Sequence, residues 1–599
     1  MIPFEQYKKK LHGCFIGKTV GGTLGMRYEG DINVHEISYY DPVPTEMVAN
    51  DDLDLQVVNL EILLHKGLPI TRYFLGDNWR LHVADSNPDE YGVAASNHRL
   101  GLNAPVSGIY RNKFTTGMGG AIRSEFWACL VPANPALAAT FAKEDACTDH
   151  SDDGLYAEMF LAAVESQAFV ETDIDKLVET GLRYVAPESR LYGAFSLVLK
   201  TYRETGDVLK TREAVLKEYF SNNWTDVIIN LSFILLSLIS SDGSFDKAIC
   251  TATSLGYDAD CTAATVGAIM GIINPDGIDE KWTAPIGDSL VISANVVNMH
   301  ANKTLSEFCD SVMSAAYFVQ NYYGAVTVDG LSNFKNLKMP KPWTENYAPL
   351  YQWNVGDKQS VLTHMPITVV LEYPERIALI PNERTEYKLK LINTNAFAVS
   401  GELNLHAPFG FAIENDCITF AIEAGEAAEY PFFVTAEKNK RRQMKNMLTV
   451  TATVNGMTFF VEGNLPLSRE WQVIDGAGNV SYYENTSSYF PVPKGKFTYK
   501  IQINSTAIRR SRISCGGTRP FVVKVNGATV YRGDGSYYVP QFHRDGTWTE
   551  TAFNWGLNDI EVEFPEHDEG EFFFGVSTTF SCAEWIDYME YYSLNEGEK

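Results

Sequence analysis

The apolar residues of this chain change their spacing near residue 350, and that change limits the folds open to it. Up to about Gly330, apolar residues recur every three or four positions, as in "TDVIINLSFILLSLI", which predicts helices. Further on, stretches such as "LTVTATVNGMTFFVEG" alternate apolar and polar residues around an Asn-Gly turn, which predicts antiparallel strands. The sequence therefore predicts an all-α domain followed by two β-sandwiches.

The length of the chain also requires several domains. A single hydrophobic core stops growing near ~250–300 residues, and this chain has 599. We expect the helical domain over residues 1–345 and the sandwiches over residues 360–467 and 470–595. The segment between the first two carries Trp343, Tyr347, Tyr351 and Trp353, which we expect to pack and hold the sandwiches in place.

Charge and composition exclude several classes of function. The net charge of −26 argues against a basic surface for nucleic acid or for anionic membranes. The longest apolar run, Val227–Ile239, is too short to span a bilayer, and we expect a buried helix there. No signal peptide opens the chain, and its nine cysteines are scattered. These features favour a cytoplasmic protein with reduced thiols, with a trimmed secreted precursor as the alternative.

Two acidic clusters stand directly before apolar helical patterns. Asp258 and Asp260 open the Gly/Ala-rich stretch "YDADCTAATVGAIMGII", and Asp51, Asp52 and Asp54 precede "LQVVNLEILL". Two charged carboxylates at ~4 Å repel each other by about 4 kcal/mol at an effective dielectric of ~20. Acidic residues at helix N-termini are common, because they cap N–H groups and face the positive end of the dipole. Two such clusters can also converge on a hard divalent cation, and the residues alone leave both explanations open.

Four blocks, in order, resemble the ADP-ribosylglycohydrolase family. They are "GCFIGKTVGGTLGMRYEG", "NDDLD", "GMGGAIR" followed by "THSDDGLYAEMF", and "GYDADCTAATVGAI". The resemblance covers roughly residues 8–330 and implies an all-helical domain with a dinuclear Mg²⁺ or Mn²⁺ centre. The last β-segment resembles galactose-binding modules of the jelly-roll type, and the one before it is expected to be Ig-like.

The resemblance also implies roles for individual residues. Glu29 is the expected acid/base carboxylate, and the expected cofactor is Mg²⁺ or Mn²⁺, as one or two ions. The expected metal positions are Asn50, Asp51, Asp52, Asp258, Asp260 and Cys261. The expected substrate-binding positions are Gly117, Met118, Gly119, Gly120, Arg123 and His150.

Several positions depart from the family pattern. Asn50, Leu53 and Cys261 stand where the family has threonines, and Met118 stands where it has an asparagine. Leu53 has no ligand atom, and a thiol is a poor partner for Mg²⁺. Retained aspartates in a changed surrounding favour a changed substrate over a dead enzyme.

Three functions remain open at this stage. The first is metal-dependent hydrolysis of an ADP-ribosyl or related ribosyl bond, in a small molecule or a modified macromolecule. The second is glycoside hydrolysis of a different sugar, and the third is a non-catalytic binding protein on a degenerate scaffold. The sequence does not indicate an oligomeric state.

Overall fold

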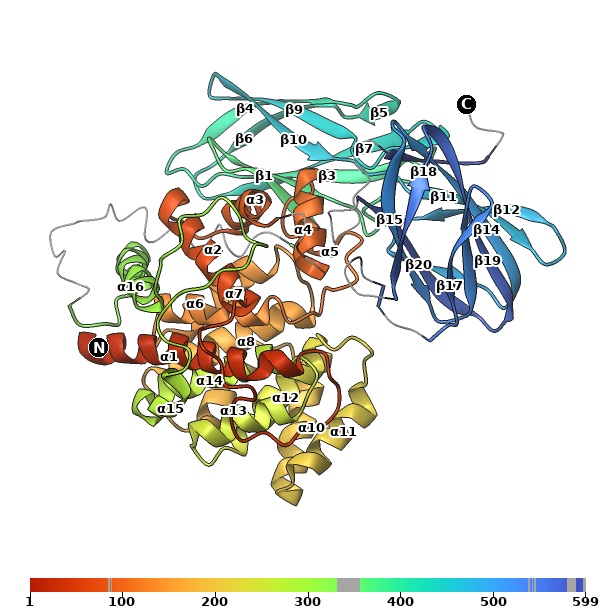
Figure 1. Ribbon diagram of the computed structural model, residues 1–599. Coiled ribbons are helices and arrows are strands. Elements are labelled where there is room, and N and C mark those ends of the chain that lie inside the picture. Colours follow the sequence, from red (N-terminus) through yellow and green to blue (C-terminus); the bar gives the residue numbers. More distant parts are fainter. Residues whose placement is uncertain are drawn as a thin grey trace. The chain divides into compact units, whose positions relative to one another are not determined.

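The computed structural model describes residues 1–84, 87, 89–330, 356–536, 539–540, 542, 546–578 and 589–595 (Figure 1). They group into two compact units. The helical unit takes the described residues of Met1–His82 and Phe114–Gln352, and the β-rich unit takes those of Val83–Lys113 and Trp353–Lys599. The linker aromatics Trp343, Tyr347, Tyr351 and Trp353 lie outside the described residues, so their expected packing stays a prediction.

The helical unit is built from α-helices and short 3₁₀ turns, as the three- and four-residue spacing predicted. Its main helices are α1 (Phe4–Gly25), α2 (Asp51–Lys66), α3 (Arg72–His82), α6 (Ser124–Leu130), α7 (Pro135–Ala146), α8 (Asp153–Ala168), α9 (Ile174–Leu182), α10 (Arg190–Thr205), α11 (Val208–Tyr219), α12 (Val227–Ile239), α13 (Phe245–Ser254), α14 (Ala259–Ile273) and α16 (Leu305–Tyr322). Shorter pieces are η1 (Met26–Tyr28), η2 (Ala121–Arg123), η3 (Pro275–Gly277) and α15 (Glu280–Thr283). Helix α12 is buried along all but its last residue, as expected for its apolar run.

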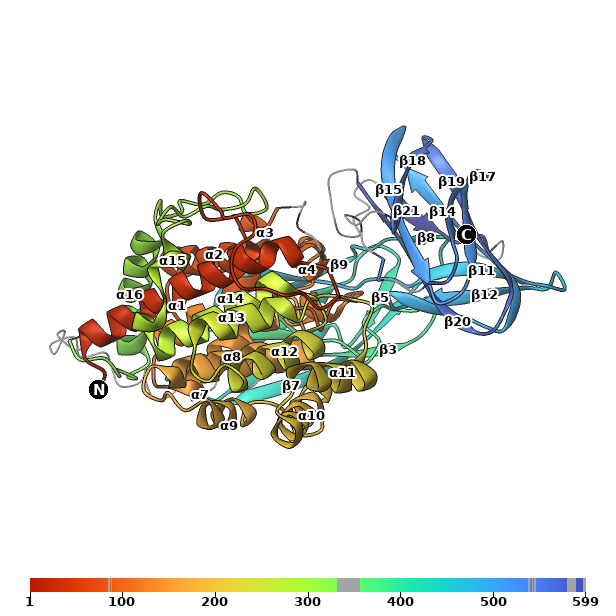
Figure 2. The same cartoon turned by 60° about the horizontal axis from the view of Figure 1, so that its bottom comes forward.

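Helices α1 and α14 run antiparallel at very short range, and Figure 2 shows them side by side. Four glycines of α1, spaced by four residues, make the approach possible: Gly13, Gly17, Gly21 and Gly25. A Cβ placed on Gly21 would lie 2.0 Å from the carbonyl oxygen of Ala263 in α14. Because a side chain has no room there, glycine lets the two backbones touch. This contact brings the C-terminal end of α1 to the N-terminal end of α14.

The β-rich unit contains two pairs of antiparallel sheets. In the first pair, one sheet has the order β1-β2-β3-β7-β5 and the other β10-β9-β4-β6. Strand β9 alternates half-buried and buried residues along its length, which is the period of two that the sequence predicted. The strands are β1 (Gln359–Thr363), β2 (Thr368–Glu372), β3 (Thr385–Ile392), β4 (Val399–His406), β5 (Phe411–Glu414), β6 (Cys417–Ile422), β7 (Ala427–Ala436), β9 (Met447–Val454) and β10 (Met457–Asn464).

The second pair joins the order β12-β11-β14-β19-β16-β17 to the order β13-β20-β15-β18. Strand β21 (Met589–Tyr592) pairs with β14 and with β8 (Arg441–Arg442), which comes from the first half of the β-rich unit. The strands are β11 (Arg469–Asp475), β12 (Val480–Asn485), β13 (Tyr489–Val492), β14 (Gly495–Ser505), β15 (Arg509–Gly517), β16 (Phe521–Val525), β17 (Ala528–Gly533), β18 (Trp548–Phe553), β19 (Gly556–His567) and β20 (Gly570–Ser577). The Ig-like and jelly-roll assignments stay predictions.

One segment of the N-terminal half belongs to the β-rich unit. Residues Val83–Lys113 contain α4 (Asp89–Arg99) and α5 (Val106–Ile109). Leu102, Val106 and Tyr110 are buried in the hydrophobic core of the first pair of sheets. The Asn103 amide donates to the carbonyl of Val361, and Asn103 accepts from Ser360 through its own carbonyl. The sequence analysis placed this segment inside the helical domain, and the three domain boundaries themselves stay predictions.

Two further observations concern the chain as a whole. No helix among the described residues combines the length and the apolarity that crossing a membrane requires. The cysteines within the described ranges are all free thiols.

Candidate functional site

The first acidic cluster begins helix α2. The side-chain oxygen of Asn50 accepts a hydrogen bond from the N–H of Asp52 at 2.9 Å, so Asn50 is the N-cap of the helix. Asp51, Asp52 and Asp54 follow in the first turn. Asp54 Oδ2 accepts from the N–H of Ser293 at 3.1 Å, and Asp54 Oδ1 is buried without a hydrogen-bond partner in the described part of the chain.

The second acidic cluster begins helix α14. Asp258 occupies the N-cap position, and its own N–H donates to the side-chain oxygen of Asn230 in α12 at 3.2 Å. Asp260 follows in the first turn. Both aspartates are almost fully buried, at 3% and 2% exposure. Among the described residues, no lysine or arginine forms an ion pair with either of them.

The two clusters meet. Asp52, Asp260 and Cys261 each offer one ligand atom, and these atoms lie within 4.8 Å of one another. Asn50 also bridges the clusters, because its amide nitrogen donates to Asp260 Oδ2 at 3.3 Å. Two buried oxygens, Asp52 Oδ2 and Asp260 Oδ1, have no hydrogen-bond partner among the described residues. Buried carboxylate oxygens without a partner are costly, and a bound cation would satisfy them.

The pKa values of these carboxyl groups reflect the cost of burying their charge. Burial, followed by the nearby Glu29 charge, raises the pKa of Asp258 and of Asp260 well above the ordinary value. Burial also raises the pKa of Asp52, against the opposing effect of the Lys18 ammonium. For Cys261, burial raises the pKa of the thiol well above its ordinary value. Burial disfavours the charged form at each position, and Lys18 offsets it only at Asp52, so the residues present fit a divalent cation.

Glu29 lies on the loop that follows α1, beside the start of α14. The loop is pinned from both sides, since the N–H of Gly30 donates to the carbonyl of Tyr257 at 2.9 Å and the N–H of Tyr257 donates to that of Asp31 at 2.8 Å. Arg212 fastens it further through the carbonyls of Ile32 and Leu255. Loss of hydration around the Glu29 carboxyl, then the charges of Asp51 and Asp52, raise its pKa to about 7. The residue as a whole remains exposed to solvent.

The glycine loop, Gly117–Gly120, is followed directly by η2, which packs on α2 and α14. All four residues are buried, and the Met118 side chain belongs to the hydrophobic core. The N–H of Gly117 donates to the carbonyl of Phe114, and that of Gly120 donates to His150 Nε2. These two N–H groups are therefore engaged within the protein.

Arg123 and His150 are fully buried, and both contact the Gly117–Gly120 loop. Arg123 donates to the carbonyl of Gly119 at 2.7 Å and forms ion pairs with Asp145 and Asp149 at 3.0 and 2.9 Å. Because His150 Nε2 accepts from Gly120, its proton resides on Nδ1, 2.7 Å from Asp149 Oδ1. Although burial opposes it, the Arg123 charge and the hydrogen bonds from His150 and Arg123 lower the pKa of Asp149 to about 2. Both side chains therefore fix the loop through hydrogen bonds to its backbone.

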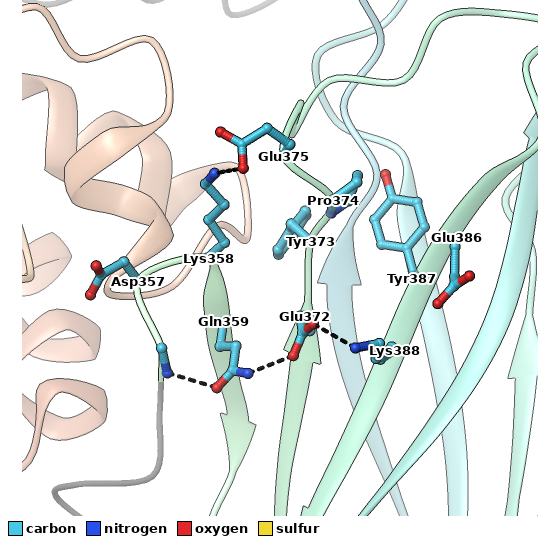
Figure 3. Close-up of a pocket in the computed structure, with 11 residues that line it drawn as sticks. Asp357, Lys358, Gln359, Glu372, Tyr373, Pro374, Glu375, Glu386, Tyr387 and Lys388 are labelled. Atoms are coloured by element: carbon cyan, nitrogen blue, oxygen red, sulfur yellow. Dashed lines mark hydrogen bonds and ion pairs between the residues drawn. The ribbon is translucent and has the colours of Figure 1, made fainter.

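The first pair of sheets in the β-rich unit carries a hollow on its surface. It measures about 530 Å³ and is lined by residues 356–359, 372–375 and 386–388, on β1, β2, β3 and the segments beside them. Figure 3 draws these side chains. The charged side chains pair with each other, as Lys358 does with Glu375 and Lys388 with Glu372. None of the site residues predicted from the sequence lines the hollow.

Two residues beside the acidic clusters, Lys18 and Asn230, were not predicted from the sequence. Lys18 of α1 lies 1% exposed, with its ammonium 3.3 Å from Asp52 Oδ1 and 2.9 Å from Glu125 Oε1. The signal for it was a single lysine inside the apolar block "GCFIGKTVGG". Asn230 was a comparable signal, one amide within the apolar run of α12.

Comparisons with solved structures give low similarity scores. A solved structure titled "ADP-ribosylglycohydrolase-related protein complex" is 18% identical, with a TM-score of 0.36, and the match covers 52% of this chain and 99% of that one. An anti-sigma factor domain-containing protein from Clostridium clariflavum is 8% identical, with a TM-score of 0.16, over 35% of this chain and 85% of that one. Scores this low carry no functional argument. No curated protein matches the chain.

A family model gives the decisive comparison. The model described as ADP-ribosylglycohydrolase matches residues 4–316, more than half of the chain, and includes every site residue named above from Lys18 to Cys261. This chain therefore belongs to the ADP-ribosylglycohydrolase family and is a glycosidase-type hydrolase.

Proposed function

We propose that this protein is a metal-dependent glycohydrolase that cleaves an ADP-ribosyl or related ribosyl glycosidic bond. The observation that carries the proposal is the meeting of two buried acidic helix starts, with one oxygen of Asp52 and one of Asp260 left without a partner, beside the Glu29 loop. Asp51, Asp52, Asp258 and Asp260 would hold the ion, with Asn50 and Cys261 at its edge. When bound, Mg²⁺ or Mn²⁺ supplies positive charge that fixes sugar hydroxyl oxygens.

The residues of the chain supply the remaining chemistry. Cleavage at an anomeric carbon passes through an oxocarbenium-like state, so a carboxyl group must pass a proton to the leaving group or take one from water. Glu29 is placed for this role, because its loop is fixed beside Asp258 and its residue remains open to solvent. Arg123 and His150 act as positioning residues that hold the Gly117–Gly120 loop.

A substrate screen tests the proposal. The purified full chain is incubated with ADP-ribosylated peptides, free ADP-ribosyl compounds and a panel of aryl glycosides, each with Mg²⁺, with Mn²⁺ or with a chelator. We expect release of ADP-ribose or ribose that depends on the ion, and its loss in Asp260→Asn together with metal binding. Undiminished release in the chelator and in Asp260→Asn would contradict the proposal.

The aryl glycosides in this screen also test whether the substrate carries a sugar other than ribose. The surroundings of the aspartates differ from the family pattern at Asn50, Leu53 and Cys261, and this difference supports a changed substrate. Ion-dependent cleavage of a non-ribosyl glycoside alone would replace the ribosyl assignment with that sugar. Binding without turnover on every substrate would favour the non-catalytic alternative.

A further inference from the structure

We infer that this site takes one divalent ion per chain, because protein donors already hold one oxygen of Asp52 and one oxygen of Asp260, the two aspartates that meet across it. The inference rests on the proposed function, since it concerns the same carboxylates. It is carried by the positions of two side chains, Lys18 and Asn50, around Asp52 and Asp260.

Lys18 takes one oxygen of Asp52. Its ammonium lies 3.3 Å from Asp52 Oδ1 and 2.9 Å from Glu125 Oε1, with the lysine side chain 1% exposed. An ammonium group only donates hydrogen bonds, so it occupies the carboxylate oxygens that it contacts and cannot itself be a ligand of a metal ion. Glu125 is fixed in turn by the Gln56 amide at 2.8 Å. A permanent positive charge therefore stands on this side of Asp52.

Asn50 takes one oxygen of Asp260. The N–H of Asp52 can only donate, so the atom of Asn50 that caps it is the oxygen. The amide nitrogen is then the atom that faces Asp260 Oδ2, at 3.3 Å. The cap thus fixes the orientation of the amide and presents a donor where an ion would need an acceptor.

The other oxygens of Asp52 and Asp260 define a single place between the two helix starts. Asp52 Oδ2 and Asp260 Oδ1 are buried and lack a partner within the described part of the chain. Asp52 and Asp260 offer ligand atoms within 4.8 Å of each other and of Cys261. Leu53 adds no ligand atom to the same turn of α2. One oxygen from each aspartate is free for an ion, and the other is held.

Counting bound Mn²⁺ tests the inference without any substrate. The full chain is stripped with a chelator and titrated with Mn²⁺, and binding is followed by calorimetry and by the electron paramagnetic resonance signal of the metal. We expect one ion per chain and no exchange-coupled pair. Two ions per chain would overturn the inference and leave the proposed function standing. No bound ion at millimolar Mn²⁺ would overturn both.

Substitution of Asn50 tests its part in the argument. Asp and Ser both cap helices about as well as Asn, so α2 should keep its start in either variant. Asn50→Asp replaces the donor by a carboxylate, and we expect it to bind a second Mn²⁺. The matched control Asn50→Ser keeps the cap without a carboxylate and should stay at one ion. One ion in Asn50→Asp would overturn the role given to the amide.

Lys18→Met tests the other side of the site. Without the ammonium, no protein cation competes with the ion for Asp52 Oδ1, and we expect Mn²⁺ to bind at least tenfold more tightly. Unchanged or weaker binding by a folded Lys18→Met protein would overturn the role of Lys18. Should the variant fail to fold, the ion count of the unmodified chain and the Asn50 pair still decide the inference.

Discussion

At the scale of single residues, Glu29 carries the sharpest prediction. Its loop is fastened beside Asp258 by backbone hydrogen bonds and by Arg212. Glu29→Gln removes proton transfer and keeps nearly the same volume, so turnover on a confirmed substrate should fall by roughly 10²–10⁴. Steady-state kinetics measure this loss, and calorimetric Mn²⁺ binding should persist.

The matched control is Glu36→Gln, on the same loop region at an exposed position. It should retain the turnover of the unmodified chain. Near-native turnover in Glu29→Gln would place the acid/base group elsewhere and would contradict the alignment of the first block with the family.

His364 predicts acid sensitivity of the β-rich unit. Burial in the loop between β1 and β2 lowers the pKa of this imidazole to about 3. The folded chain keeps it neutral while the unfolded chain protonates it below about pH 6.5, so acid favours unfolding. From about pH 6.5 down to 3, His364 should lower the unfolding free energy by about 1.4 kcal/mol per pH unit.

Urea titrations of unfolding at several pH values, followed by circular dichroism, measure that slope. His364→Leu should remove its part of the slope, because leucine does not bind a proton. The control His406→Leu, at an exposed position on β4, should keep the slope of the unmodified chain. Identical slopes in all three proteins would show that His364 does not contribute.

The residues of the site were predictable to different degrees. Asp52, Asp258 and Asp260 stand in contiguous motifs, and the sequence therefore placed them correctly at the starts of two helices. Lys18 and Asn230 reach the site from α1 and α12, and nothing in their own neighbourhoods indicates which carboxylate or N–H they face. Such pairings depend on how helices cross, which residue spacing does not encode.

At the scale of elements, the contact of α1 with α14 joins stability to the site. Gly21→Ala would place a Cβ 2.0 Å from the backbone oxygen of Ala263, and backbone cannot move aside as a side chain can. Overpacking of this kind costs roughly 1–3 kcal/mol, which urea unfolding followed by helical circular dichroism measures. Because α1 carries the Glu29 loop to α14, turnover should fall as well.

The next residue of α1 provides the control. A Cβ on Gly22 meets the Asn50 amide nitrogen at 3.1 Å, and that side chain can shift. Alanine is also the better helix former by up to about 1 kcal/mol. Gly22→Ala should therefore change stability by less than Gly21→Ala does, and equal losses would contradict the backbone-contact explanation.

Helices and strands were predicted best where apolar residues recur at a regular spacing. The buried run Val227–Ile239 is helix α12 from end to end, and "LTVTATV" lies in β9. The place of α4 and α5 was not predictable in the same way. Their residues are helical by local pattern, yet their partners, such as Val369 and Leu391, lie in strands more than 250 positions further along the chain.

At the scale of the whole molecule, the return of Val83–Lys113 to the β-rich unit predicts the behaviour of a shortened chain. A fragment of residues 1–330 keeps the helical core and its own hydrophobic cluster, so it should fold. In that fragment Leu102, Val106 and Tyr110 lose the core that buries them. Limited proteolysis with mass spectrometry should find cleavage within Val83–Lys113 in the fragment and protection there in the full chain. Equal protection in both proteins would contradict this division.

During synthesis, the segment Val83–Lys113 is made long before the strands that cover its apolar side chains. A ribosome adds about 5–20 residues each second, and Leu362, a core partner of Leu102, is made 260 positions later. The emerging chain must therefore carry three uncovered apolar side chains for roughly 10–50 seconds. Holdase chaperones bind apolar stretches of this kind. Newly made copies of this protein should accordingly depend on chaperones until translation has passed the first strands.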